Sequence, residues 1–116
     1  MDSKKSKKKI ELIEKLISHN LKIINFFQTD LTKYKILLMV MNGYYKSQET
    51  TIEKIIENLP SAISSRAHKL NCITEANARS YLIKEHSKTD LRKKNLIPSN
   101  DLVEEFEEYL KILSNV

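Results

Sequence analysis

The sequence predicts a mainly helical domain with one small β-hairpin near its C-terminal end. Only one glycine and two prolines occur in 116 residues, so few tight turns interrupt the helices. Apolar residues recur at steps of three and four over most of the chain, which is the period of an amphipathic helix. Two short runs, 81–86 and 92–97, flank the polar turn 87–91 and are typical of a hairpin. The length fits a single domain.

The N-terminal part of the chain divides into a tail and a helix. Residues 1–9 are rich in Lys and Ser, and we expect them to be disordered, followed by one domain over 10–116. The first helix is predicted over 10–28, with one apolar stripe of Ile10, Ile13, Ile17, Leu21, Ile24 and Phe27 and a second of Leu12, Leu16, Ile23 and Phe26. This apolar arc is wider than one contact in a small domain needs. Either the helix is deeply buried, or one stripe faces a second subunit.

The next two helices have clear start signals. Asp30 is a good N-cap for a helix over 31–45, which we expect to be the central core helix. Its inward face is predicted as Leu31, Tyr34, Leu38, Met41 and Tyr45, thickened by Ile36, Leu37 and Val40. A short helix follows over 52–58, with Thr50 or Thr51 as its cap. Glu53 completes a capping box only if Thr50 is the cap.

Two further helices are predicted. Pro60 ends the short helix, and Ser61 caps a longer one over 62–79. Its inward face is predicted as Ile63, Ala67, Leu70, Ile73 and Asn77, and its outer face as Ser64, Ser65, Arg66, His68, Lys69 and Cys72. After the hairpin, Ser99 or Asn100 caps a last helix over 101–113. We expect this helix to pack against the first one.

Charge is unevenly distributed along the chain. The net charge is +5, and residues 61–95 hold eight Lys and Arg against three carboxylates, whereas the last helix is acidic. A basic block beside an acidic helix suits nucleic-acid binding, because phosphate attraction supplies affinity that is independent of sequence. Ordinary solvated faces explain the charge pattern equally well, so charge alone does not decide.

The arrangement of elements is more specific. Two helices joined by a three-residue turn, the second with a polar and cationic face, form a helix-turn-helix whose second helix enters the major groove. A basic hairpin directly after it is typical of the wing of a winged helix-turn-helix. The candidate DNA-binding residues are Ser61, Ser64, Ser65, Arg66, His68, Lys69, Lys88, Thr89, Arg92, Lys93 and Lys94.

The hairpin also resembles a known family. The segment from Tyr81 to Ser99, with the Asp-x-Arg element Asp90/Arg92, is similar to the wing of MarR-like transcription regulators, and Leu31-Thr32 before Tyr34 is similar to that family's entry into its helix-turn-helix. The resemblance covers roughly Leu31 to Leu110. It implies that Arg92 contacts DNA at the wing and that Asp90 holds the wing in place by ion pairing.

We therefore predict a sequence-specific regulator that binds double-stranded DNA as a homodimer. The alternatives are a winged-helix adaptor that binds protein, or a nucleoid-like DNA binder of low specificity. Cys72 is the only cysteine, and no apolar run is long enough for a membrane span, so we expect a cytoplasmic, nucleoid-associated protein without a membrane partner. No catalytic signature is present, which predicts no enzyme.

The sequence also predicts no metal site and no cofactor. His19, His68 and His86 are scattered, and we find no carboxylate or thiol at ligand spacing from them. Cys72 has no evident resolving partner, so we interpret it as inert and not as a redox sensor.

Overall fold

The protein folds as a winged helix-turn-helix with additional helices at both ends. The structure is a computed structural model that describes residues 3–18 and 21–114. Within these residues lie α1 (Ser3–Ser18), α2 (Lys22–Gln28), α3 (Leu31–Tyr45), α4 (Ile52–Asn58), α5 (Arg66–Ala78), β1 (Leu82–His86), β2 (Lys94–Pro98) and α6 (Asn100–Ser114). The element order confirms the predicted mainly helical fold with one hairpin.

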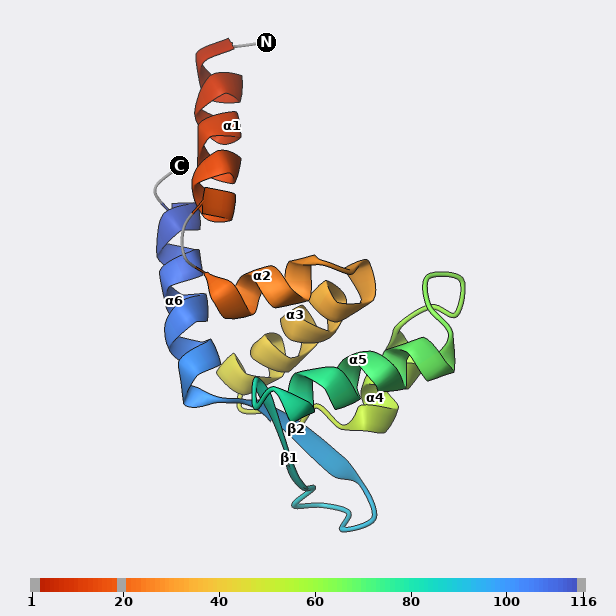
Figure 1. The fold of residues 1–116 in the computed structure, drawn as a ribbon. Coiled ribbons are helices and arrows are strands. Elements are labelled where there is room, and N and C mark those ends of the chain that lie inside the picture. Colours follow the sequence, from red (N-terminus) through yellow and green to blue (C-terminus); the bar gives the residue numbers. More distant parts are fainter. Residues whose placement is uncertain (1–2, 19–20, 115–116) are drawn as a thin grey trace.

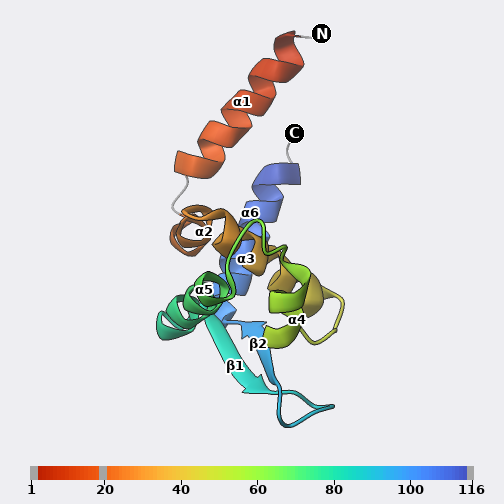
Figure 2. The same cartoon turned by 90° about the vertical axis from the view of Figure 1, so that its right-hand side faces the viewer.

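The elements are arranged along one long axis. Figure 1 shows α1 and the C-terminal end of α6 at one end of the molecule and the β1–β2 hairpin at the other, with α2 to α5 between them. The view turned by 90° shows the same separation (Figure 2). The extents of the molecule are 52 × 31 × 24 Å, because α1 projects beyond the body. Among the described residues, no helix is sufficiently long and apolar to cross a membrane.

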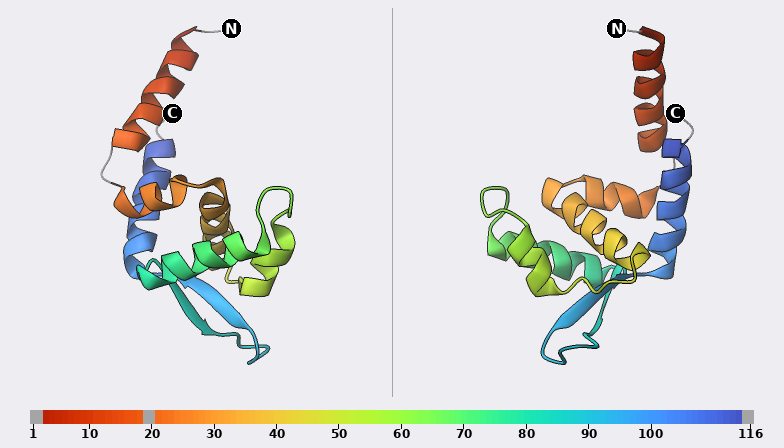
Figure 3. Two further views of the ribbon diagram at one scale, coloured as in Figure 1. Left: turned by 45° about the vertical axis from the view of Figure 1, so that its right-hand side comes forward. Right: turned by 180° about the vertical axis from the view of Figure 1, so that it is seen from behind.

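The single helix predicted over 10–28 is wrong, because the structure has two helices there. The first, α1, begins at Ser3, so the structure also differs from the expected disordered tail. Lys has a good helix propensity, which permits this N-terminal extension. The second, α2, turns across α3 and α6 (Figures 1 and 3). Because of this change of direction, Leu21, Ile24 and Phe27 are almost fully buried. A single straight helix that continued α1 could not bury these three residues.

The start of α2 is held by a residue of α6. Leu21 precedes the helix and offers no side-chain cap. Instead, the backbone N–H of Ile24 donates a hydrogen bond to Oε1 of Glu105, at 3.0 Å. A carboxylate at a helix N-terminus satisfies a free amide and interacts favourably with the helix dipole. The last helix of the chain thus fixes the position of α2.

The core helix α3 has the predicted bounds and cap. Asp30 accepts hydrogen bonds from the backbone N–H groups of Thr32 and Lys33. The predicted inward face is only partly right: Met41 is buried, but Leu31, Leu38 and Tyr45 are exposed. The residues that fill the core are Ile36, Leu37, Val40 and Met41. Their side of α3 is covered because α2, α5 and β2 all pack against this helix.

The loop between α3 and α4 fastens the hairpin to the helices. Thr51 caps α4, so the alternative with a Thr50 capping box is wrong. Thr50 has another role: its backbone N–H donates to Oδ1 of Asn95 at 2.7 Å, and its carbonyl accepts from the N–H of Leu96 at 2.9 Å. The Thr50 side chain also lies directly over Gly43, where a Cβ atom would collide with it. Gly43 therefore allows α3 and this loop to approach closely.

The start and the inward face of α5 both differ from the prediction. Residues 61–64 form a turn in which the carbonyl of Pro60 accepts from the N–H groups of Ile63 and Ser64. Ser65, and not Ser61, is the N-cap, because its Oγ accepts from the N–H of His68 at 3.1 Å. The buried residues of the helix are Lys69, Cys72, Ile73 and Ala76. Ile63 and Ala67, predicted to point inward, are exposed.

The hairpin and the last helix agree with the sequence. The strands pair antiparallel from Leu82 opposite Pro98 to His86 opposite Lys94. Ser99 caps α6 through a 3.2 Å hydrogen bond from the N–H of Leu102. This helix packs against both α1 and α2, as expected for the contact between the end helices.

Candidate nucleic-acid interface

The outer face of α5 is polar and made of small side chains. Its exposed positions from the N-cap onward are Ser65, Arg66, Ala67, Asn71, Thr74 and Ala78. None of these side chains except Arg66 is bulky, so the helix surface is narrow. An α-helix with such a face can enter the DNA major groove and bring short donors and acceptors to base edges.

The structure buries two of the candidate DNA contacts, Ser64 in the turn before α5 and Lys69 on the helix, which corrects their assignment. Ser64 is 6% exposed, and its hydroxyl lies against the Ser65 carbonyl. Lys69 is 4% exposed, and its Nζ donates to the carbonyl oxygens of Ile56, at 3.1 Å, and Leu59, at 2.6 Å. The ammonium thus uses its hydrogen-bond donors at the C-terminal end of α4, where a cation also interacts favourably with the helix dipole. Lys69 holds α4 against α5 and cannot reach a phosphate.

His68 is only partly available for a contact with DNA, because its ring already contacts two other side chains. Its Nε2 lies 3.0 Å from Oδ2 of Asp30 and 3.6 Å from Sγ of Cys72. Burial disfavours the charged form of Asp30, but hydrogen bonds from His68 and from the N–H groups of Lys33 and Thr32 outweigh this and lower its pKa. Burial raises the pKa of the Cys72 thiol, and the Asp30 charge adds to that effect.

This arrangement corrects the prediction that no carboxylate or thiol lies at ligand spacing from a histidine. His68 and Cys72 are one helical turn apart on α5, and Asp30 joins them from the start of α3. His86 lies on the wing beside Lys94. His19 falls outside the described residues.

The wing presents a row of exposed cations. Lys84, Lys88, Arg92, Lys93 and Lys94 are all exposed. Asp90 and Arg92 form the expected ion pair, with Arg92 Nε 3.2 Å from Oδ1 and Nη2 3.3 Å from Oδ2 of Asp90. The Arg92 side chain is 91% exposed, so the pair contributes little to stability. Its effect is to orient the guanidinium, and the hydrogen bond from Arg92 lowers the pKa of Asp90.

The base of the wing turn is held by a residue that sequence reasoning missed. Glu49, in the loop between α3 and α4, accepts from the Ser87 hydroxyl at 2.7 Å and from the N–H of Lys88 at 2.9 Å. Ser87 is 1% exposed, and its oxygen also accepts from the N–H groups of Thr89 and Asp90. The hydrogen bond from Ser87, followed by that from Lys88, lowers the pKa of Glu49. The carboxylate therefore remains charged at neutral pH and fixes the wing to the helices.

The structure thus divides the candidate residues into two surfaces. Arg66 and Ser65 lie at the start of α5, with Ser61 exposed in the preceding turn, and Lys88, Thr89, Arg92, Lys93 and Lys94 lie on the wing. Asn71 and Thr74 were missed because the helix face was assigned with Lys69 outward. The spacing of Cys72, Ile73 and Ala76 as buried positions would have indicated the correct face.

The chain matches no protein-family model and no curated protein. It is similar in structure to the heme sensor protein PefR from Streptococcus agalactiae, solved in complex with heme. The TM-score is 0.50 at 19% sequence identity, and the match covers 97% of this chain and 77% of PefR. At this identity the likeness shows the fold, and it agrees with the winged helix-turn-helix described above.

We predict that Lys69→Met destabilises the protein without removing a DNA contact. Methionine keeps the buried stem but leaves the Ile56 and Leu59 carbonyls without their donor, which should lower the free energy of unfolding by about 1–3 kcal/mol. Urea denaturation measures the change, with Lys93→Met as the control, because that exposed side chain should alter stability by less than about 0.5 kcal/mol. Equal unfolding midpoints for the two variants would contradict the role of Lys69.

We predict that Glu49→Gln loosens the wing while the helices stay folded. The neutral amide replaces a charged acceptor, so the hydrogen bonds from Ser87 and Lys88 weaken. Amide hydrogen exchange should become faster at residues 87–93 and remain unchanged in α3. Glu53→Gln, on the exposed side of α4, is the matched control. Unchanged exchange in the wing of the Glu49 variant would show that this carboxylate does not hold the turn.

Proposed function

We propose that the chain is a sequence-specific transcription regulator that binds double-stranded DNA, with α5 in the major groove and the wing at the minor groove. The observation that carries the proposal is the outer face of α5, which is exposed, narrow and polar. A winged helix that binds protein through this helix would need exposed aromatic or leucine side chains there. The described outer face has none.

The chemistry of α5 fits base recognition. Arg66 stands in the first turn, where a side chain can reach a guanine edge or a phosphate. Asn71 follows farther along the exposed face, and its amide can form two hydrogen bonds with adenine. Ala67 and Thr74 keep the helix narrow and supply methyl groups for thymine contacts. This mixture favours a specific reader over a nucleoid-like binder of low specificity.

The chemistry of the wing fits the minor groove and its phosphates. The wing holds five cations and two carboxylates over residues 82–98. Asp90 orients Arg92 but leaves it exposed to solvent. Arg is suited to a narrow minor groove, where the negative potential is strongest at A·T-rich sequence. The resemblance of this segment to the MarR-like wing supports the same role.

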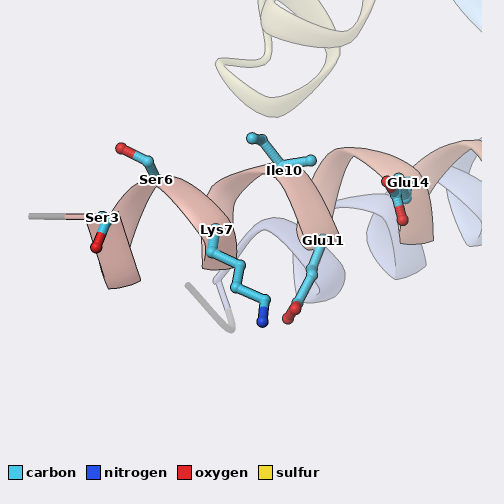
Figure 4. Close-up of a pocket in the computed structure, with 6 residues that line it drawn as sticks. All are labelled: Ser3, Ser6, Lys7, Ile10, Glu11 and Glu14. Carbon is cyan, nitrogen blue, oxygen red and sulfur yellow. The ribbon is translucent and has the colours of Figure 1, made fainter.

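We also propose that the protein acts as a homodimer through α1 and α6. Ile10 and Ile13 on α1 are each 56% exposed, and Leu110 and Leu113 on α6 are also exposed. Among the described residues, those that line a hollow of about 560 Å³ beside α1 all belong to that helix, namely Ser3, Ser6, Lys7, Ile10, Glu11 and Glu14 (Figure 4). A single helix cannot enclose a ligand, so a second subunit is the better partner for this face. Two-fold symmetry would then place two α5 helices on successive major grooves.

The DNA proposal predicts affinity that depends on both surfaces and on salt. The Arg66→Ala/Arg92→Ala variant should bind an A·T-rich duplex roughly tenfold or more weakly than the wild type. Its plot of log affinity against log salt should be shallower by about two, one for each lost phosphate contact. Fluorescence anisotropy over a salt series measures both quantities.

The control removes the same charge elsewhere. Lys22→Ala/Lys35→Ala changes cations on α2 and α3, outside α5, the wing and the proposed dimer helices, and should bind DNA with nearly wild-type affinity. If both double variants weaken binding equally, only net charge matters and the interface is wrong. If the wild type does not bind at low salt, the DNA proposal fails and the protein-binding adaptor replaces it.

The dimer proposal predicts a mass that depends on α1. The wild type should elute at twice its chain mass of 13.6 kDa in chromatography with light scattering. Ile10→Lys/Ile13→Lys should elute as a monomer, because two charges would have to be buried in the interface. Ile83→Lys changes an exposed isoleucine on β1 and should remain dimeric. A monomeric wild type would overturn this proposal.

A further inference from the structure

We propose that Asp30, His68 and Cys72 form a Zn²⁺ site that ties α5 to the start of α3 and thereby raises affinity for DNA. The site itself depends only on these three side chains, whereas its effect on DNA rests on the function proposed above. The three ligand atoms lie within 4.8 Å of one another. They come from two segments that are far apart in the sequence.

The separations of the His68 nitrogen from the other two ligand atoms fit tetrahedral coordination. With Zn–N, Zn–O and Zn–S bonds of about 2.0–2.3 Å at tetrahedral angles, neighbouring ligand atoms should be about 3.3 Å apart for N and O and about 3.6 Å for N and S. In the protein, His68 Nε2 lies 3.0 Å from Asp30 Oδ2 and 3.6 Å from Cys72 Sγ. The ligand atoms of Asp30 and Cys72 lie within 4.8 Å of each other, against about 3.5 Å for O and S on one tetrahedral ion. Ion binding would therefore draw these two side chains together by at most about 1.3 Å.

The shared nitrogen argues against a catalytic triad. In a Cys-His-Asp triad, the carboxylate and the thiol use different ring nitrogens, so that a proton is taken at one and oriented at the other. Here both Asp30 and Cys72 face the same Nε2 of His68. Three ligand atoms that converge on one point are typical of a metal centre.

The donor set selects the kind of metal. One thiolate, one imidazole and one carboxylate suit Zn²⁺, whereas Ca²⁺ and Mg²⁺ prefer oxygen ligands alone. On binding, the Cys72 thiol loses its proton to solvent, and the two anionic ligands neutralise the charge of the ion. The His68 side chain is 44% exposed, so water can reach a fourth coordination position. Glu75, the neighbouring carboxylate, is already paired with Lys33 and Arg79.

The position of the site in the fold links α5 to α3. The two carboxylate oxygens of Asp30 have different partners: Oδ1 caps α3, and Oδ2 faces His68. His68 and Cys72 lie in the first two turns of α5, the part that begins with Arg66. An ion bound here would hold the DNA-facing helix to the core helix. A preorganised helix binds with less conformational cost, so the apparent affinity rises.

Cobalt spectroscopy tests the site. We expect Co²⁺ to bind the tag-free protein once per chain, with a thiolate-to-cobalt charge-transfer band and strong visible bands typical of tetrahedral coordination, and Zn²⁺ to displace it. Cys72→Ala should lose the charge-transfer band. Asp30→Asn keeps an N-cap residue and His68→Gln keeps a polar side chain, so both should fold but bind Co²⁺ about tenfold or more weakly.

The control variant is Glu75→Gln, which changes the nearby carboxylate outside the site and should bind Co²⁺ like the wild type. Absence of the charge-transfer band in the wild type, or a band unchanged by Cys72→Ala, would overturn the site. Circular dichroism of each variant shows whether lost binding reflects lost folding. If Cys72→Ala unfolds, Cys72→Ser takes its place, because serine is closer to cysteine in size and polarity.

DNA anisotropy with Zn²⁺ and with a chelator tests the coupling. Zn²⁺ should tighten binding by about tenfold in the wild type, within the usual range of allosteric coupling, and have no effect on Asp30→Asn. Cobalt binding without any effect of Zn²⁺ on DNA affinity would reject the coupling and leave the site. If no form of the protein binds DNA, the proposed function fails, whereas the cobalt titration still decides the site.

Discussion

The buried ammonium of Lys69 sets the geometry of α5, on which the proposed DNA-binding surface depends. By donating to the carbonyls of Ile56 and Leu59, it joins the end of α4 to the first turn of α5. A buried ammonium is tolerated only when its hydrogen bonds are satisfied, so the rotation of α5 about its own axis is tightly defined. That rotation turns Cys72 and Ile73 inward and leaves Asn71 and Thr74 facing solvent.

The same contact explains where sequence reasoning succeeded and where it failed. The bounds of α3 and α4 could be predicted because Asp30, Thr51 and Pro60 give strong local start and stop signals. The face of α5 was assigned wrongly, because Lys is almost never fully buried and Lys69 was therefore placed outside. Its first residue was also predicted wrongly: Ser61 was taken as the cap, whereas residues 61–64 form a turn after Pro60 and Ser65 is the cap.

The candidate site shows the same division between local and tertiary information. The ion pair of Asp90 and Arg92 spans two residues and follows from the family resemblance. The anchor at Glu49 joins residues about 40 apart, and the contact of Asp30 with His68 spans 38 residues. Neither of these two contacts produces a periodic pattern in the sequence. The spacing of His68 and Cys72, one turn apart, was readable, but its partner carboxylate depends on how α5 packs against α3.

Polar contacts, more than apolar packing, position the surfaces that would meet DNA. The buried apolar residues of α5 are Cys72, Ile73 and Ala76, of which only Ile73 is large. Lys69 joins this helix to α4, and His68 joins it to α3. Glu49 holds the wing. Hydrogen bonds to charged groups are directional and sensitive to a bound ion, whereas a large apolar interface would hold α5 in one position regardless of ligand. A helix that is held mainly by such contacts can be shifted or stiffened through a single side-chain cluster. The cluster of Asp30, His68 and Cys72 lies in the N-terminal half of α5, the part of the helix that is proposed to meet DNA.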